Sequence, residues 1–255
     1  MLGRSQKLED IYILGEIIPE AIKVDPDALA ETIRLEDEFF IIKEEEESKY
    51  RDCFTISYLN INRLKPHWID LKSDDLFMKS DVISLGETWL KPSEHVSFEE
   101  DGFEGSEVNI GDGKGVMAFS KLEHFVRSTT SSSDTFSAVF LETKEFDLIF
   151  LYLSQKVEWR KLEELFELWI RNERSVAVIG DVNIDFLDGS HKLMAYMKDK
   201  GFTQLVKEPT HICGGLIDHI YVNEKLMQRK PFYSQQSVTY SDHDKIVLHV
   251  PLENN

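Results

Sequence analysis

The chain has 255 residues, of which 42% are hydrophobic, and a net charge of −18. This length allows one large domain or two small ones with a sizeable core. No apolar run approaches the roughly 18 residues that span a bilayer, which argues against a membrane helix. Because the N-terminus lacks the apolar stretch of a signal peptide, we expect an intracellular protein.

The acidic balance argues against a generic nucleic-acid binder, because counterion release rewards Lys and Arg at the contact face. Residues 1–50, with 14 acidic and 6 basic side chains, supply −8 of the −18 and leave −10 for the rest. A phosphate-binding function therefore requires metal-binding carboxylates and a local basic rim. The only cysteines, Cys53 and Cys213, fit a reducing compartment, and we expect no disulfide between them.

Residues 1–50 are predicted to be an acidic extension of helical character. Residues 8–24 and 28–42 have helical spacing, and Asp25-Pro26 is typical of a helix start. The run Glu44–Glu47 indicates an exposed linker. We therefore predict an appendage over 1–50 and the main domain over 51–255.

The main domain alternates strands with a few helices. Runs rich in β-branched and aromatic residues predict strands at 54–59, 82–85, 116–119, 125–129, 136–143, 146–153, 176–179, 216–222 and within 237–250. Helical patterns occupy 66–79, 158–173, which has an apolar stripe from Leu162 to Ile170, and 190–201, which Ser190 caps and Gly201 ends. This order predicts an α/β architecture with two sheets face to face and helices outside.

Polar side chains gather where the predicted strands begin or end. Taken singly, each is an ordinary strand-end residue, but together they predict an active site. The set is Asn60, Glu87, Tyr152, Asp181, Asn183, Asp218, Asp242 and His243.

This set suits phosphodiester hydrolysis with a hard divalent cation. Carboxylate and amide oxygens bind Mg²⁺, which neutralises phosphoryl charge, while a carboxylate orients or deprotonates water. A histidine held in one tautomer by an aspartate stabilises the pentacovalent phosphorane.

Five short motifs occur in a characteristic order. They are Leu59–Asn62, Gly86–Leu90, Gly180–Asn183, Leu216–Ile220 and Ser241–His243. Their order and spacing resemble the endonuclease/exonuclease/phosphatase superfamily, in particular its AP-endonuclease branch. The resemblance is greatest to the endonuclease domains of non-LTR retrotransposons and Helitron-type mobile elements. It covers about residues 53–251 and implies a DNase-like, four-layer sandwich of two sheets flanked by helices.

The resemblance also implies an activity and residue roles. The activity would be a Mg²⁺-dependent DNA endonuclease, with Mn²⁺ as a substitute, that leaves 3′-hydroxyl and 5′-phosphate ends. Glu87 and Asn60 would bind the metal, with Asp242 near it. Asp181 would activate water, and His243, oriented by Asp218, would stabilise the transition state. The groups holding the phosphate or substrate would be Asn183, Tyr152, Asn62 and Gln155. The protein would act on DNA in the nucleus, either as a monomer or as part of a larger polyprotein.

Two departures and two other functions qualify this reading. Gln155 stands where the family has an asparagine, and Gly86 replaces a larger polar residue before the glutamate. A phosphatase of the same fold is disfavoured, because Cys213–Asp218 stands in place of the sequence motif that inositol phosphatases of this fold carry around the late aspartate. A non-catalytic relic acting as a binding module is the other alternative. His211 and His219 are interpreted as structural, and 111–115 as a turn rather than a phosphate loop.

Overall fold

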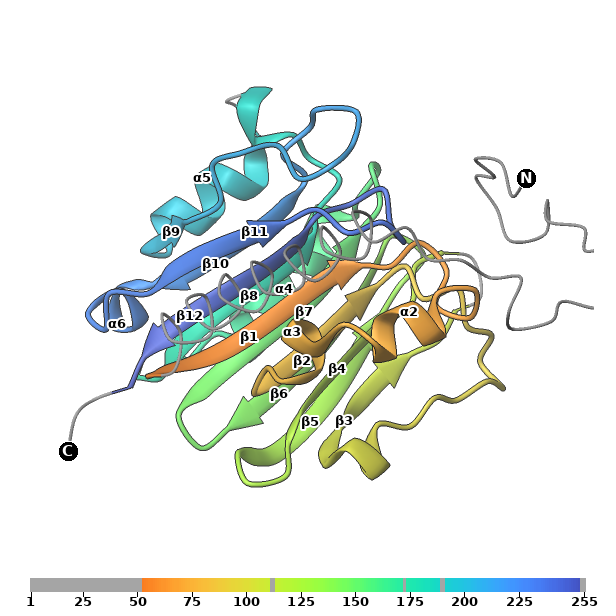
Figure 1. Cartoon of the computed structure of the whole chain (residues 1–255). Helices are drawn as coiled ribbons and strands as arrows, with labels where there is room; N and C mark the ends of the chain where they lie inside the picture. The colour runs from red at the N-terminus through yellow and green to blue at the C-terminus, as the bar shows by residue number, and fades with distance from the viewer. Residues whose placement is uncertain (1–51, 111–112, 172, 189–190, 253–255) are drawn as a thin grey trace, which may run out of the picture. The chain divides into compact units, whose positions relative to one another are not determined.

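The structure of the protein is a computed structural model that describes residues 52–110, 113–171, 173–188 and 191–252. The extension predicted over 1–50, the cap predicted at Ser190 and part of the turn predicted at 111–115 lie outside these residues. Two six-stranded sheets form the framework of this part of the chain (Figure 1).

The first sheet has the strand order β11-β12-β1-β2-β4-β3. Its strands are β1 (Cys53–Asn60), β2 (Val82–Gly86), β3 (Phe103–Val108), β4 (Val116–Lys121), β11 (Phe232–Gln236) and β12 (Lys245–Pro251). Only the central pair β1–β2 is parallel, and the other neighbours are antiparallel.

The second sheet repeats this plan in the order β5-β6-β7-β8-β10-β9. Its strands are β5 (Phe125–Ser132), β6 (Phe136–Thr143), β7 (Phe146–Leu153), β8 (Ser175–Asp181), β9 (Phe202–Gln204) and β10 (Asp218–Asn223). Again one central pair, β7–β8, is parallel and the rest are antiparallel.

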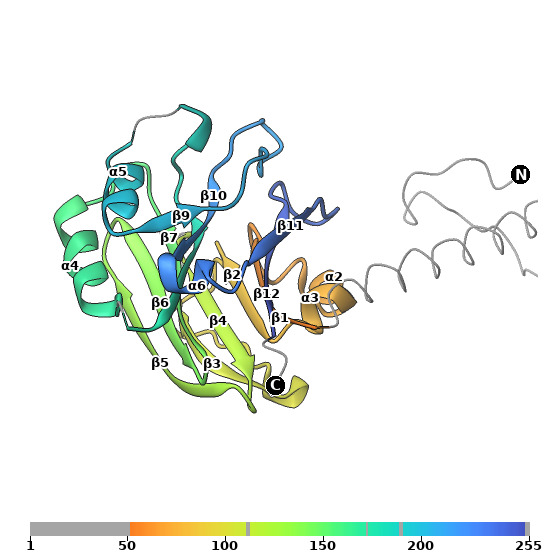
Figure 2. The same cartoon turned by 90° about the vertical axis from the view of Figure 1, so that its left-hand side faces the viewer.

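Helices cover the outer face of each sheet. Figure 2 shows α4 (Trp159–Trp169) and α5 (Lys192–Asp199) on one side of the domain, and α2 (Trp68–Lys72) and α3 (Asp75–Met78) on the other. The short helix α6 (Glu224–Met227) and the 3₁₀ turns η3 (Glu99–Asp101) and η4 (Phe186–Asp188) complete the elements. The predicted architecture of two stacked sheets with helices outside is confirmed.

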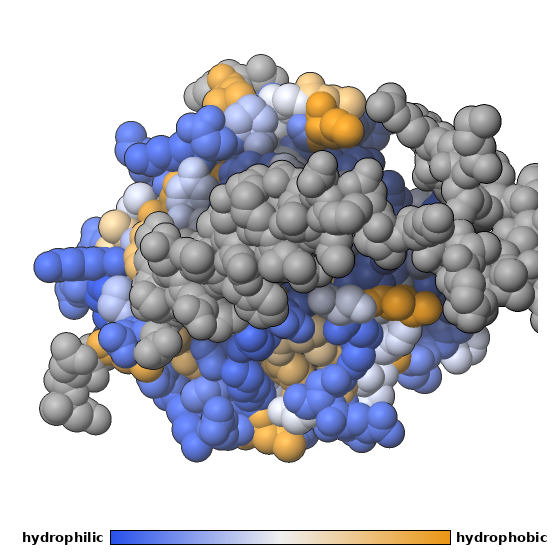
Figure 3. Space-filling model, in the orientation of Figure 1, coloured by the Kyte–Doolittle hydropathy of each residue, from blue (hydrophilic) through white to orange (hydrophobic). Residues whose placement is uncertain are grey.

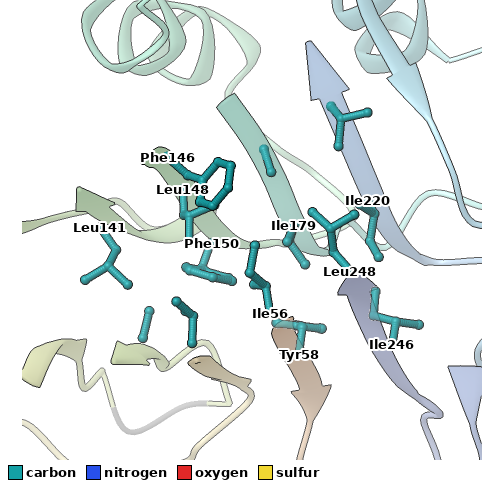
Figure 4. Packing of buried hydrophobic residues seen from close by; sticks show 14 of the residues in the cluster. Ile56, Tyr58, Leu141, Phe146, Leu148, Phe150, Ile179, Ile220, Ile246 and Leu248 are labelled. Carbon is teal, nitrogen blue, oxygen red and sulfur yellow. The ribbon is translucent and has the colours of Figure 1, made fainter. Parts of the chain in front are cut away.

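Three hydrophobic clusters separate the four layers. Between the sheets, Ile56 of β1 packs in the same cluster as Leu148 and Phe150 of β7 (Figure 4). A second cluster joins α4 and α5 to the outer face of the second sheet, and a third joins α2 and α3 to that of the first. Because the central strands are covered on both faces, they read as nearly continuous apolar runs rather than as alternating patterns.

Several elements differ from the sequence prediction. Strands β3, β9 and β11 were not predicted, because they are short or contain polar residues that suit exposed strand faces. The stretch 66–79 forms two helices, since Asp74 accepts the Phe77 amide and caps a new one. The helix predicted over 158–173 ends at Trp169, where Ile170 becomes extended.

Among the described residues, no helix is both long and apolar enough to cross a bilayer. The coloured surface in Figure 3 is largely hydrophilic, with hydrophobic residues in separate small spots. Both cysteines have free thiols, as their number and the expected compartment predicted.

The strand directions bring distant residues to one edge of the sandwich. Asn60 ends β1 and Asp181 ends β8, so both lie at the carboxyl end of a parallel pair. Asp218 begins β10 and His243 precedes β12. Because β10 runs antiparallel to β8, and β12 antiparallel to β1, the starts of these strands meet the same edge.

Candidate functional site

Asp181 lies at the centre of this edge and is almost fully buried. One carboxylate oxygen accepts the Asn60 side-chain amide at 2.8 Å, and the other accepts the Asn183 main-chain N–H at 2.8 Å. The bond from Asn60 crosses from the first sheet to the second. Gly180 is required before Asp181, because a Cβ there would lie 1.8 Å from the Leu151 carbonyl oxygen.

His243 and Asp218 form a buried pair beside Asp181. His243 Nδ1 lies 2.8 Å from an Asp218 carboxylate oxygen, so the other ring nitrogen is left for chemistry. The Ser241 hydroxyl donates to the Asn60 carbonyl at 2.6 Å and accepts the His243 amide at 3.1 Å. These bonds fix the loop before β12 directly onto the end of β1.

Glu87 and Tyr152 complete an inner group of side chains. Its other members are Asn60, Asp181, Asp218 and His243. In the second sheet, Tyr152 and Asp218 lie directly opposite Asp181 on its two neighbouring strands, so the three form a row. Glu87 follows β2, and its carboxylate interacts with Asn60 and with the Tyr152 hydroxyl. Burial and the charges of Glu87 and Asp181 raise the pKa of Tyr152, which keeps the phenol protonated as a donor.

Backbone strain is concentrated at this edge. Among the described non-glycine residues, six have positive φ, and Asn62, Arg63, Glu87, Trp89 and Asn183 lie in loops here. Asparagine tolerates the left-handed region, but Glu87 at φ 48° has no such local advantage. Strain of this kind persists where the surrounding structure enforces it, and it is frequent at functional sites.

A second group lies on the rim, in contact with the first. The Asn62 side-chain amide donates to both carboxylate oxygens of Asp242, at 3.2 and 3.3 Å. His211 Nε2 lies 3.6 Å from Asp242, and its ring lies 4.7 Å from that of His243. His211, interpreted from the sequence as structural, therefore lies beside the site, where a β-bridge pairs it with His243.

His219 behaves as the sequence predicted. Alternation along β10 turns it away from Asp218. Its ring contacts the Ile184 and Leu216 carbonyl oxygens and the Tyr221 hydroxyl, behind the site.

The electrostatics are those of several carboxylates without enough positive charge. Desolvation, followed by the charge of Asp218, raises the pKa of Asp181 well above its usual value. Desolvation also raises the pKa of Glu87. Burial alone would lower the pKa of His243, but the charge and hydrogen bond of Asp218, with Asp181 and Asp242 nearby, raise it to about 9.

These residues fit a divalent cation. Within the described part of the chain, no Lys or Arg pairs with Glu87, Asp181 or Asp218. Asp218 Oδ1 is buried and lacks a hydrogen-bond partner there. Ligand atoms of Asp181, Asp218 and His243 lie within 4.8 Å of one another, as do those of the group made by His211, Asp242 and His243. Neither group includes Glu87, which was predicted to bind the metal.

A polar cleft of about 430 Å³ adjoins the inner group. The residues that line it include Tyr152, Asn183, Gln155, Lys114 and Lys156. Several other Lys and Arg side chains form ion pairs with acidic side chains. Lys121, Arg127, Arg160, Lys161 and Arg229 contact Asp81, Glu142, Glu164, Glu158 and Glu145.

No family model and no curated protein matches the sequence. Solved structures match the fold. The endonuclease domain of TRAS1, a telomere-specific non-LTR retrotransposon, aligns with a TM-score of 0.58 and 16% identity over 79% of this chain and 100% of that one. An AP endonuclease from Archaeoglobus fulgidus gives 0.61 and 17% over 78% and 100%. A 3′-5′ exonuclease (NExo) from Neisseria meningitidis gives 0.60 and 15% over 77% and 99%.

These structures share one architecture. The chain has the fold of the endonuclease/exonuclease/phosphatase superfamily. The resemblance seen in the five motifs is thereby confirmed at the level of fold. The five motifs lie at strand ends and in the adjoining loops, at one edge of the sandwich.

The structure brings together nearly all the residues that the sequence analysis selected. Asn60 and Asn183 donate to Asp181, and Asp218 pairs with His243. The Ser241 hydroxyl links the two sets by bonding to both Asn60 and His243, and Gln155 lines the adjoining cleft. Two residues that contact the site were not predicted from the sequence, Tyr58 and Thr210. The Tyr58 hydroxyl accepts the Asp181 main-chain N–H at 3.0 Å. The Thr210 hydroxyl accepts the Asp218 amide at 3.0 Å. No sequence signal marks Tyr58, because it stands within an apolar strand run.

Proposed function

We propose that this protein is a phosphodiester hydrolase that acts on DNA with a divalent cation, Mg²⁺ in the first instance. The observation that carries the proposal is the convergence of a buried His243–Asp218 pair and an amide-held Asp181 at one edge between the two sheets. The excess of carboxylate charge there supports a cation, and the adjoining cleft supports an extended substrate.

The residues have separate tasks in this proposal. Asp181, kept in place by Asn60 and Asn183, orients the attacking water and accepts its proton. The protonated His243, held by Asp218, donates to a non-bridging phosphoryl oxygen as charge develops there. Tyr152 and Asn183 supply neutral donors to the same phosphate, and Gln155 lies along the cleft toward the next nucleotide.

A bound cation would be held by Glu87 and Asn60, with Asp242 near it, as the family resemblance implies. When bound, it would supply Lewis-acid stabilisation of the phosphoryl charge. Attack of water at phosphorus with cleavage of the P–O3′ bond would leave the 3′-hydroxyl and 5′-phosphate ends that the family resemblance implies. The motif pattern supports a mobile-element origin.

Nicking of supercoiled plasmid in Mg²⁺ tests the proposal. We expect conversion to the open circle, loss of activity in EDTA, and a loss of about 10²- to 10⁴-fold in Asp181→Ala, the range for removing a general base. Asp199→Ala, at the exposed end of α5, is the matched control and should cleave normally. Folded wild type that cleaves neither plasmid nor an abasic duplex would contradict a nuclease. Phosphate release from monoesters instead would indicate a phosphatase.

A further inference from the structure

One buried hydroxyl below the site has no role in the proposed chemistry. Tyr58 lies in the middle of β1 with no exposed surface, and Figure 4 labels it in the layer between the sheets. Its hydroxyl accepts the Asp181 main-chain N–H at 3.0 Å, from a residue 123 positions away in the other sheet. A buried tyrosine requires a partner for its hydroxyl, and this one has taken the main chain of the central aspartate.

Tyr58 and Asn60 act on the same residue from the same face of β1. Residues two apart in a strand point to one face, so both side chains face the second sheet. Asn60 bonds to the Asp181 carboxylate, and Tyr58 bonds to the Asp181 amide. Together they fix both the side chain and the main chain of Asp181 across the gap between sheets.

The hydroxyl also keeps a proton to donate. Its oxygen accepts from Asp181, so the O–H remains available to a further acceptor. Asp218, Asp181 and Glu87, in that order, are the carboxylates whose charges act most strongly on the phenol. Among the described residues no hydrogen bond joins the Tyr58 hydroxyl to these carboxylates, and Asp218 Oδ1 has no partner. The phenol is therefore a neutral neighbour of the carboxylates and adds no further charge to be desolvated.

Gly86 gives the hydroxyl its space. A Cβ at Gly86 would lie 2.3 Å from the Tyr58 hydroxyl oxygen and 3.2 Å from the ring carbon that bears it. The small residue before Glu87, which departs from the superfamily pattern, is thereby explained by the tyrosine on the neighbouring strand. The two positions form a matched pair in this chain.

We propose that Tyr58 is a positioning residue of this site, whose hydroxyl, in the space left by Gly86, fixes the Asp181 main chain from the opposite sheet. This inference rests on the proposed function for its catalytic consequence only. The hydrogen bond to Asp181 can be tested without any activity.

The first test is a double-mutant cycle on DNA cleavage by the full chain. Tyr58→Phe should lower kcat by about 10- to 100-fold with KM for DNA within about twofold, the range for leaving the buried Asp181 N–H without an acceptor. Gly86→Ala should cause a similar loss by displacing the hydroxyl. The double variant should lose little beyond Tyr58→Phe, because the 2.3 Å conflict with the hydroxyl is gone and only the milder 3.2 Å contact with the ring carbon remains. Tyr221→Phe, which removes another buried hydroxyl, should retain wild-type kcat.

The second test is amide hydrogen exchange at Asp181. Exchange should be faster in Tyr58→Phe than in wild type and unchanged in Tyr221→Phe. Wild-type kcat in Tyr58→Phe, losses that multiply in the double variant, or an equally protected Asp181 amide would each overturn the inference. Absence of cleavage by wild type would refute the proposed function alone, and the exchange experiment would still decide the role of Tyr58.

Discussion

At the scale of single residues, one buried histidine of the site carries a positive charge. His243 is 6% exposed, yet Asp218 at 2.8 Å keeps it protonated. A donor fixed in this way needs no reorganisation when charge develops on the phosphate. His211, whose Nδ1 accepts the Cys213 amide, has only the more distant Asp242 carboxylate, 3.6 Å from its Nε2.

Replacing His243 tests this assignment. We expect His243→Ala to lower kcat for DNA cleavage by about 10²- to 10³-fold, as for the loss of one transition-state donor. Steady-state kinetics on a defined duplex measures the effect, with exposed His95→Ala as the control. A loss below about threefold, where one mutation removes only a modest contact, would contradict the role.

His219 predicts a pH dependence of stability. Burial lowers the pKa of His219 from 6.5 to about 4, against the effect of its carbonyl contacts. The unfolded chain therefore binds a proton at this residue between about pH 6.5 and 4 while the folded chain does not. Stability is unaffected above this window and falls as the pH drops through it, by about 3 kcal/mol in full.

Urea unfolding at pH 7 and pH 4.5 measures this dependence. His219→Gln should reduce the difference in unfolding free energy between the two pH values, and His95→Gln should leave it unchanged. An equal pH dependence in wild type and His219→Gln would show that other groups are responsible.

At the scale of elements, a buried ion pair anchors the loop that carries His243. Lys245, at the start of β12, bonds to both carboxylate oxygens of Asp74 at 2.8 and 2.7 Å. Tyr240 donates to the same carboxylate from the other side of the loop, at 2.8 Å. Asp74 also caps α3. The segment 241–244 is thus held at both ends by one aspartate.

Breaking this pair should destabilise the protein more than breaking a surface pair. Lys245→Met leaves Asp74 buried without its cation, and we expect a loss of about 3–5 kcal/mol of unfolding free energy. Lys65→Met, which breaks an exposed pair with Glu94, should cost no more than about 1 kcal/mol. Chemical denaturation of both variants decides the matter, and equal losses would contradict the anchoring role.

At the scale of the whole molecule, the two sheets meet at an edge where negative charge accumulates from both. Glu87 comes from the first sheet and Asp181 and Asp218 from the second. Their mutual repulsion opposes close packing of the sheets at that edge, while the apolar layer beneath favours it. A divalent cation would relieve this repulsion and stabilise the sandwich.

Thermal unfolding with and without Mg²⁺ tests this directly. A cation that binds only the folded state should raise stability by about 2.7 kcal/mol at a hundred times its dissociation constant. The rise in Tm should be lost in EDTA and in Glu87→Gln, and retained in Glu164→Gln on exposed α4. The same rise in Glu87→Gln would place the cation elsewhere.

The sequence by itself determined the sandwich and most of the site. Apolar runs long enough to be covered on both sides marked the central strands, and polar residues at their ends marked the reactive edge. These signals are local in the chain, so they survive without knowledge of the fold. Strands such as β9 and β11 were missed because their pairing, rather than their composition, makes them strands.

Only the tertiary structure decided which of these residues touch. Tyr58 in β1 reaches the Asp181 amide, and His211 lies against His243, through contacts between segments far apart in sequence. It also showed that Gly86 leaves space for a side chain of the next strand. The physical reason is that hydrogen bonding and packing depend on register and on the stacking of two sheets, and neither is written in any single segment.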